Sequence, residues 1–399
     1  MKPFTLIRES ALPLHRQLLN ELRHAILTGA LKPHDQLPGE LELVAQLGLS
    51  RATIRRAWES ALEEGLLYRV AGKGTYVSDL QPPLPRRKIV GFLVPGFHSA
   101  FDSQLLAGAE NVLRSQGYGV LFACTERDVD EENRLLREMC DDSVAGLLIW
   151  PAVTSVTNGR YILSAQYRLP TVLLDRPLPG VALPCVTSHN YHGGVQATNH
   201  LLALGHREIA FLASPLLDLW PIAERCRAYQ ETMRGAGLEP LPPLLVGPRE
   251  EIRVDAVRHS VAEAYASEIS DLAAALARPG RPTAIFAMND LMALLTVIAA
   301  GQAGLRVPHD LSVVGFDNLS LVEHFAPPLT TVAQDPFKMG AEAARRLLTI
   351  VEGEPANDVW TLLPTCLVVR ASTAPPPEGG DPQKDSQFYD LKLPRHNAL

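Results

Sequence analysis

The sequence predicts an α/β protein with a small helical domain at the N-terminus and a larger domain of parallel β-sheets with helices on both faces. Three observations predict this. At 399 residues the chain is too long for one hydrophobic core. From residue 89 onward, short apolar runs alternate with amphipathic helical patterns, as in sheets whose strands are buried on both sides. Between these two regions, DLQPPLPRRK (79–88) is rich in proline and typical of an extended linker.

These patterns set the expected boundaries. We predict a first domain at 1–78, a linker at 79–88 and a two-lobed domain at 89–373. The last segment, 374–399, opens with the low-pattern stretch APPPEGGDPQKDSQ, so we expect a disordered tail there.

Charge is shared unevenly between the two regions. Residues 1–88 carry a net charge of +4 and the rest of the chain −11, which is a reason to look for nucleic acid at the basic end. The start, MKPFTLIRES, lacks the apolar core of a signal peptide, and the longest apolar runs are too short to span a bilayer. We therefore expect a cytoplasmic protein with no membrane partner.

The five cysteines are scattered and never spaced as CxxC. This spacing argues against a zinc site and against a disulfide framework, so we expect reduced thiols. The sequence predicts neither a metal site nor a cofactor.

The first 65 residues predict three helices. In LHRQLLNELRHAIL (14–27), an apolar residue recurs at every fourth position, and Gly29 is expected to end this helix. A short second helix lies in GELELVAQLG and closes at Gly48. After a tight turn, Ser50 is a good N-cap for the third helix. A helix, a short turn and a second helix form the layout of a helix-turn-helix, whose second helix enters the major groove of DNA.

The third helix separates apolar from basic residues. Its apolar face is formed by Ile54, Ala57, Trp58 and Ala61. Arg51 and Arg55 lie one turn apart on the other side, where a planar guanidinium can donate two bonds to guanine or hold a phosphate. The candidate DNA-binding residues of this helix are Ser50, Arg51, Thr53, Arg55 and Arg56, with the two hydroxyls assigned to phosphates.

A hairpin is predicted directly after the third helix. The strand-like runs LLYRV and GTYVS flank AGKG, which places Gly72, Lys73 and Gly74 at the tip. A hairpin at this position is the wing of a winged helix-turn-helix, and its tip is expected to touch DNA. The alternative is a solvated basic helix followed by an ordinary hairpin.

Residues 13–78 resemble the winged helix of the GntR family of regulators. The matching stretch is PLHRQLLNELRHAILTGALKPHDQLPGELELVAQLGLSRATIRRAWESALEEGLLYRVAGKGTYV. Three positions depart from the family pattern. Gly39 replaces the serine that usually caps the second helix, and Leu41 stands where many members have an arginine that touches DNA. Arg56 replaces a frequent glutamate, so contacts are expected to centre on the third helix.

Seven strands are predicted in the larger domain. They are IVGFLV (89–94), YGVLFAC (118–124), AGLLIW (145–150), PTVLLD (170–175), REIAFLA (207–213), TAIFAM (283–288) and LSVVGFD (311–317). Ligands of open α/β sheets bind beyond the carboxyl ends of the strands. The candidates there are Phe97, Ser99, Phe101, Asp102, Trp150, Asp175, Arg176, Asn289, Asp290, Asp317 and Asn318. Taken singly, the Asp and Asn residues could also be helix caps or turn formers.

Residues 89–373 resemble the sugar-sensing domain of the LacI family, which is related to periplasmic sugar-binding proteins. The resemblance rests on GVLFACTERDVDEENRLLREMCDDSVAGLLIWP, LPTVLLDRPLPG, PTAIFAMNDLMAL, GLRVPHDLSVVGFDN and PPLTTVAQDPFKMGAEAARRLL, among others. It implies a two-lobed, periplasmic-binding-protein-like fold. It also implies that sugar hydroxyls bind Asp175, Arg225 in RCRAY, Asn289, Asp290 and Asp317.

Aromatic residues near these positions are further candidates. Phe97, Phe101, Trp150 and Trp220 could stack on a sugar or a base, or could simply pack in the core. One departure is Ala228, which stands where the RxxGY pattern has glycine. The combination of a GntR-type reader with a LacI-type sensor resembles the arabinose repressor type of bacterial regulators.

These features predict a homodimeric transcription factor, most simply a repressor, that binds a palindromic double-stranded operator and responds to a small carbohydrate. A purine- or nucleoside-responsive regulator is the alternative within the class. A sugar-processing enzyme is the alternative outside it, but the sequence offers no GxSxG, P-loop or dinucleotide-binding motif. His189 and His192 are assigned to a polar rim. The sequence leaves open the effector, the operator and the sign of regulation.

Overall fold

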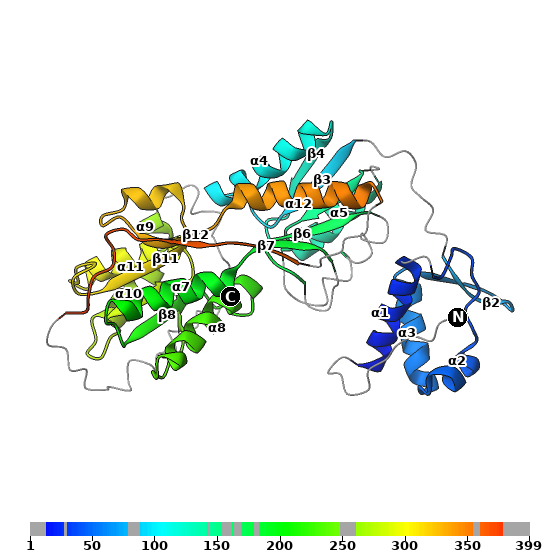
Figure 1. Ribbon diagram of the computed structural model, residues 1–399, viewed down its shortest axis with the longest axis horizontal. Helices are drawn as coiled ribbons and strands as arrows, with labels where there is room; N and C mark the ends of the chain where they lie inside the picture. The colour runs from blue at the N-terminus through cyan, green and yellow to red at the C-terminus, as the bar shows by residue number, and fades with distance from the viewer. Residues whose placement is uncertain are drawn as a thin grey trace.

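The structure is a computed structural model that describes residues 13–27, 30–78, 88–141, 144–152, 162, 169–178, 183–247, 261–353 and 360–377. It contains a small N-terminal domain and two α/β lobes (Figure 1). The predicted helix end at Gly29, the linker up to residue 87 and the tail from 378 lie outside the described residues. Residues 374–377 are described, and the N–H of Ala374 donates to Ser312 Oγ at 3.0 Å, so the fold continues past the boundary expected at 373.

The N-terminal domain contains the three predicted helices and the predicted hairpin. These are α1 (Leu14–Leu27), α2 (Glu40–Leu47), α3 (Arg51–Glu63), β1 (Leu67–Val70) and β2 (Gly74–Val77). The two strands pair antiparallel. Leu18, Leu22, Ile54 and Trp58 fill the core, as the apolar spacing requires. The expectation of a winged helix-turn-helix is confirmed.

The first lobe is a six-stranded parallel sheet. Its order is β13-β7-β6-β5-β3-β4. The strands are β3 (Ile89–Val94), β4 (Gly119–Cys124), β5 (Gly146–Ile149), β6 (Thr171–Leu174), β7 (Cys185–Ser188) and β13 (Trp360–Leu363). On one face, α4 (Ala100–Ser115) packs beside α12 (Pro336–Val351) in a shared core. Leu136 and Met139 of α5 (Val129–Asp141) belong to a second apolar cluster. Helices therefore cover both faces, as predicted.

The crossing of α4 and α12 depends on two glycines. A Cβ added at Gly108 would overlap the carbonyl oxygen of Phe337, and one added at Gly340 would overlap that of Leu105. Each glycine thus lets the backbone of the facing helix approach directly. As a result, α12 is held firmly to the helix whose first turn lines the pocket described below.

The second lobe is a six-stranded mixed sheet of order β14-β12-β11-β10-β8-β9. Its strands are β8 (Ile209–Ala213), β9 (Leu244–Leu245), β10 (Ala284–Ala287), β11 (Ser312–Asp317), β12 (Thr330–Ala333) and β14 (Cys366–Val368). Only β14 runs antiparallel to its neighbour. The helices are α7 (Asn190–Ala203), α8 (Trp220–Gly235), α9 (Val261–Ala264), α10 (Ala266–Leu276) and α11 (Asp290–Gln302), with a short 3₁₀ helix, η2 (Ser320–His324).

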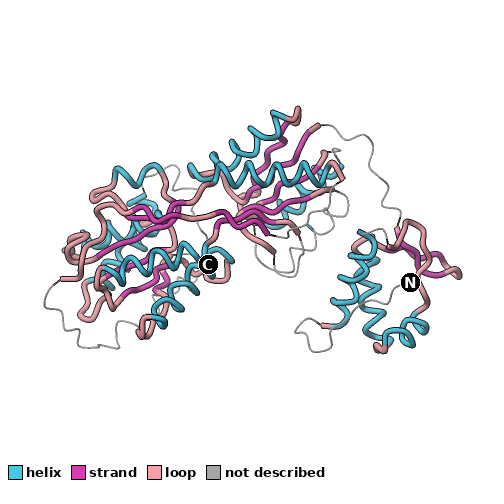
Figure 2. Tube along the Cα trace, viewed as in Figure 1, coloured by secondary structure: helices cyan, strands magenta, loops and turns pink. Residues whose placement is uncertain are grey.

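Three chain crossings join the lobes. They follow β7, β12 and β13, and lead into α7, α12 and β14 respectively. Figure 2 shows these crossings between the two sheets. The N–H of His189 donates to the carbonyl oxygen of Leu363 at 2.8 Å, so two of the crossings are bonded to each other. His189 therefore belongs to the connection between the lobes.

Candidate functional sites

The first candidate site is the N-terminal turn of α3. Ser50 caps the helix as predicted, and its Oγ accepts a hydrogen bond from the N–H of Thr53 at 3.1 Å. The side chains of Arg51 and Arg55 are 66% and 62% exposed. Arg51 Nε donates to Glu40 Oε2 at 2.9 Å, and Arg55 Nε donates to Glu59 Oε1 at 3.2 Å. Each bond engages the arginine through Nε, and both side chains remain largely exposed.

Arg56 differs in its surroundings. Its charge contributes to lowering the pKa of His15, after the larger effect of burial, so Arg56 lies on the side of α3 that is near α1. Arg51 and Arg55 sit one helical turn apart, away from the buried Ile54 and Trp58. That these residues contact DNA stays a prediction.

Hydrogen bonds and a ring contact from neighbouring side chains hold the backbone of the wing. Gly72 and Gly74 have φ values of 72° and 127°, which explains why glycines occupy the tip. The carbonyl oxygen of Lys73 accepts bonds from Gln36 Nε2 at 2.7 Å and from the Tyr76 hydroxyl at 3.3 Å. The Tyr76 ring also stacks on Tyr68, with centroids 5.6 Å apart. The exposed Lys73 side chain is thus presented on a fixed backbone.

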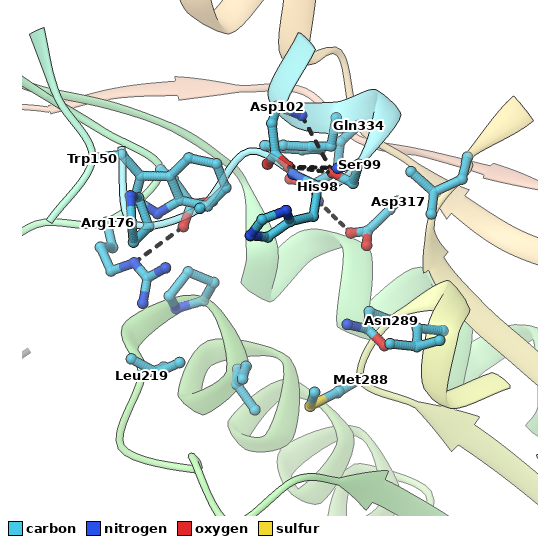
Figure 3. A pocket seen from close by; sticks show the side chains of 18 of the residues that line it. His98, Ser99, Asp102, Trp150, Arg176, Leu219, Met288, Asn289, Asp317 and Gln334 are labelled. Carbon is cyan, nitrogen blue, oxygen red and sulfur yellow. Dashed lines mark hydrogen bonds and ion pairs between the residues drawn. The ribbon is translucent and has the colours of Figure 1, made fainter. Parts of the chain in front are cut away.

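The second candidate site is a cavity of about 140 Å³ between the two lobes. Its walls come from the ends of strands in both sheets, from the first turns of α4 and α8, and from the crossing after β12. Figure 3 shows side chains of both lobes converging on it. Its position agrees with the expected location beyond the carboxyl ends of the strands. The predicted candidates that line it are Ser99, Phe101, Asp102, Trp150, Asp175, Arg176, Arg225, Asn289 and Asp317.

Four predicted ligand residues do not line this cavity, and one of them, Asn318, accepts a bond from Arg370 Nη2 through Oδ1 at 2.8 Å. Phe97 is 39% exposed and meets Phe122 edge-on, with centroids 4.9 Å apart. Trp220, on α8, instead meets Trp360 of the first lobe in a T-shaped contact at 5.5 Å. Asp290 points into the second lobe. Their assignment to the pocket is corrected accordingly.

The burial of Asp290 has a structural reason. Its carboxylate accepts bonds from the Thr331 hydroxyl at 2.6 Å and from the N–H of Leu319 at 2.8 Å. Burial raises the pKa of Asp290, and these two bonds oppose the rise. Asp290 therefore ties α11 to β12 and to the loop after β11.

Asp102 combines a structural role with a position at the pocket. Its Oδ2 accepts bonds from the N–H groups of His98 and Ser99, at 2.9 and 2.7 Å, and from Ser99 Oγ at 2.9 Å. Ser99 in turn caps α4 in a capping box. All three bonds to Asp102 end on one oxygen, so its orientation in the pocket wall is fixed by the helix terminus.

Arg225 is the centre of the second lobe's wall. Its guanidinium is buried, with Nε donating to Asn190 Oδ1 at 2.9 Å and Nη1 to the carbonyl oxygen of Met288 at 2.6 Å. The guanidinium carbon lies 3.6 Å from the centre of the Phe316 ring, a cation–π contact. Arg225 Nη1 also lies 3.8 Å from Asp317 Oδ1. One arginine thus connects α7, β10 and β11.

Asp317 is held in an unusual backbone conformation. Its φ is 115°, and that of Asn318 is 57°, both in the region that favours glycine. Burial raises the pKa of the Asp317 carboxyl, while the Arg225 charge opposes the rise. Gln334 Nε2 donates to Asp317 Oδ1 at 2.7 Å. Strained polar residues at strand ends are typical of ligand sites.

The first lobe contributes an aromatic wall. The rings of Phe101 and Trp150 lie 5.6 Å apart and are tilted by 58°. The Arg176 guanidinium lies 5.6 Å from the centre of the Trp150 ring, and its Nε is 3.3 Å from Asp175 Oδ2. Asp175 also has a positive φ, 64°. This wall offers an apolar surface bordered by charged groups.

Two buried polar atoms of lining residues have no hydrogen-bond partner in the described part of the chain. They are Trp150 Nε1, a donor, and Gln334 Oε1, an acceptor. A buried polar group without a hydrogen-bond partner lowers stability by ~1–3 kcal/mol, so these two atoms are expected to bond to a partner from outside the chain. A hydroxyl group can satisfy either, because it both donates and accepts.

The cavity also contains residues that the sequence analysis missed, notably His98, Arg127 and Gln334. His98 Nε2 lies 3.1 Å from Glu126 Oε2. Gln334 follows β12, a strand that was not predicted. Its position after TTVA would have identified it as a strand-end residue, had that strand been recognised.

Glu132 lies close to the first-lobe wall and predicts a pH dependence of the protein's stability. It is buried, accepts a bond from the N–H of Ala152 at 2.7 Å, and its pKa is raised by burial to about 6. Because the folded pKa exceeds the unfolded value, the protein loses stability as the pH rises from the unfolded pKa through the folded one. Glu132→Gln should therefore gain up to ~2 kcal/mol relative to the unmodified protein between pH 4 and pH 7.

Denaturant unfolding at several pH values measures this difference. The control is Glu131→Gln on the same helix, where the bond from Arg134 lowers the carboxyl pKa, so its pH trend should have the opposite sign. A stability difference for Glu132→Gln that does not change with pH would contradict the assignment.

Comparisons with known proteins cover both parts of the chain. Residues 14–77 match the family described as bacterial regulatory proteins, gntR family, and residues 198–373 match the periplasmic binding protein-like domain. The chain is 30% identical over 380 residues to the arabinose metabolism transcriptional repressor of Geobacillus stearothermophilus, which covers 92% of this chain and 99% of that protein.

Two solved structures are similar in fold and at 26% sequence identity. The complex of the transcriptional regulator CelR with cellobiose has a TM-score of 0.61 and covers 84% of this chain and 100% of that one. A dimeric Lac repressor with a C-terminal deletion also has a TM-score of 0.61 and covers 72% and 100%.

No described helix is both long and apolar enough to cross a membrane. Within the same residues, no group of three or more His, Cys, Asp or Glu side chains is arranged to hold a metal ion.

Proposed function

This chain belongs to the gntR family of bacterial regulatory proteins and combines a winged DNA-binding domain with a periplasmic binding protein-like domain. From this premise we propose that it is a transcriptional repressor whose affinity for its operator is controlled by a small carbohydrate bound between the two lobes. Its full-length relative is a transcriptional repressor by name, and the CelR structure holds a sugar. We place its action in the cytoplasm and assign it no catalytic step.

The observation that carries the proposal is the chemistry of the interlobe cavity. Carboxylates, amides and guanidinium groups from both lobes surround an aromatic wall formed by Phe101 and Trp150. A sugar presents the same combination, with hydroxyl groups around its edge and C–H groups on its face. The partnerless atoms of Trp150 and Gln334 supply one donor and one acceptor for such a ligand.

Control of DNA binding would follow from lobe closure. A ligand that touches both lobes favours one lobe arrangement, and the first lobe begins directly after the linker. A hundredfold preference for one conformation corresponds to ~2.7 kcal/mol of coupling. We propose that the chain acts as a homodimer, as the dimeric Lac repressor does, with two winged domains on a palindromic operator.

A purine or nucleoside effector is the second candidate. The tilted pair of Phe101 and Trp150 favours it, because a planar base can also stack on such a wall. The carboxylates Asp102, Asp175 and Asp317 favour the sugar, since each can accept hydrogen bonds from hydroxyl groups.

One experiment tests the function and separates the two effectors. An operator is selected from a random DNA pool with the full-length protein, and its affinity is measured with panels of monosaccharides, disaccharides and nucleosides. We expect a palindromic site, and at least a tenfold change in affinity with one sugar. Failure to select any sequence contradicts the DNA-binding role, whereas a response to nucleosides alone rejects the sugar.

A further inference from the structure

Leu41 lies in an unusual position for an apolar side chain. It is 71% exposed, and no large apolar side chain in the described residues is more exposed. It belongs to the first turn of α2, whose buried contact is made two residues later by Leu43, which is 1% exposed. Leu41 therefore contributes nothing to the core, and its exposure to water is unfavourable by itself.

Its surroundings place it beside the base-reading end of the domain. Glu40, the preceding residue, accepts the bond from Arg51 Nε at 2.9 Å. This bond joins the N-terminal turn of α2 to that of α3, the turn expected to enter the major groove. Leu41 is thus adjacent in the chain to the residue that orients Arg51.

The charge of this turn argues against a contact with the phosphate backbone. Glu40 and Glu42 flank Leu41, so the first turn of α2 is acidic. Gly39, the N-cap residue, has no side chain to cap the helix. Carboxylates repel phosphates, whereas a neutral apolar group fits the one apolar group exposed in the major groove, the 5-methyl group of thymine.

We propose that Leu41 packs against the 5-methyl group of a thymine in each operator half-site, near the base that Arg51 contacts. Leu41 is then a specificity-determining residue that favours thymine over cytosine at that position. The proposal rests on the DNA-binding function proposed above.

The test removes the methyl group alone. In the selected operator, each thymine is replaced in turn by deoxyuridine, and the affinities of the full-length protein and of Leu41→Ala are compared. At one symmetric position, the replacement by deoxyuridine should weaken binding by the unmodified protein about fourfold per half-site. This is the value for one buried methyl group. Leu41→Ala should show no loss at that position, and its affinity for the thymine operator should equal that of the unmodified protein for the uracil operator.

Two controls make the result specific. Leu321→Ala removes a similarly exposed leucine, 58% exposed, from the second lobe and should keep the full response to the methyl group. Arg51→Ala should bind more weakly overall but still distinguish thymine from uracil. Equal sensitivity of the unmodified protein and Leu41→Ala at every thymine would overturn the proposal while leaving DNA binding intact. Loss of all operator selection would instead reject the proposed function.

Discussion

Replacing Arg225 with alanine should abolish the response to the effector while leaving operator binding in place. The guanidinium holds Asn190 and the Met288 carbonyl and is the counter-charge of Asp317. Without it, these buried acceptors lose their donor, and the pKa of Asp317, already raised by burial, should rise further. We expect affinity for the effector to fall at least about a hundredfold, or ~2.7 kcal/mol, in calorimetric titration.

The matched control lies two residues along the same helix. Arg227 is 49% exposed and pairs with Glu224 and Glu231 on the surface. Arg227→Ala should bind the effector normally and lose at most ~1 kcal/mol of stability. Normal induction of Arg225→Ala would place the effector outside the interlobe cavity. Loss of folding is excluded first, by comparing far-UV circular dichroism and thermal unfolding of the two variants.

Replacing Gly340 with alanine should cause a large loss of stability in the two-lobed domain. The added methyl group would overlap the carbonyl oxygen of Leu105, part of a helix backbone that cannot rotate away. The two helices must separate, and overpacking of this kind costs ~3 kcal/mol. We expect the thermal midpoint of the larger domain to fall by roughly 6–12 °C, measured by scanning calorimetry.

Gly301→Ala provides the control for the effect of alanine itself. Gly301 lies in α11 with open space around the position of a Cβ. Alanine there should leave stability unchanged or raise it by up to ~1 kcal/mol, because glycine is the poorer helix former. A midpoint for Gly340→Ala equal to that of Gly301→Ala would show that the backbones of α4 and α12 are not in direct contact at this glycine.

Much of the N-terminal domain could be predicted because local signals decide it. The Ser50 cap, the αL glycine at Gly48 and the apolar face of α3 are each specified within a few residues. The wing is likewise specified by its glycines, which adopt the positive φ values expected at a hairpin tip. Interactions between distant residues, such as the bond from Arg51 to Glu40, were not predicted, because periodicity does not report them.

In the larger domain, the strand-end rule found most of the pocket but could not resolve neighbouring residues. Asn289 and Asp290 are adjacent, yet Asn289 lines the cavity whereas Asp290 faces Thr331. Consecutive residues at a helix start point about 100° apart, so one of the pair is directed inward. The sequence carries no signal that tells which one.

A missed strand explains why Gln334 was overlooked, whereas His98 and Arg127 follow β3 and β4, which were predicted. Five strands were not predicted: β7, β9, β12, β13 and β14. Each has two to four residues, and β13 pairs with β7, which is far away in the sequence. Runs this short are common outside sheets, and pairing with a distant strand decides them. Gln334 and the partner of Trp220 were overlooked for this reason.

The contact between Trp220 and Trp360 can affect the sensitivity of the protein to its effector without affecting its selectivity. It joins α8 of the second lobe to β13 of the first, outside the cavity lining. An aromatic contact of this kind contributes ~0.5–1.5 kcal/mol, and neither tryptophan lines the cavity that would hold the effector. Substitutions at this pair would shift the threshold concentration of every effector by the same factor and keep their rank order. Sensitivity can therefore evolve at the tryptophans while selectivity is conserved in the cavity.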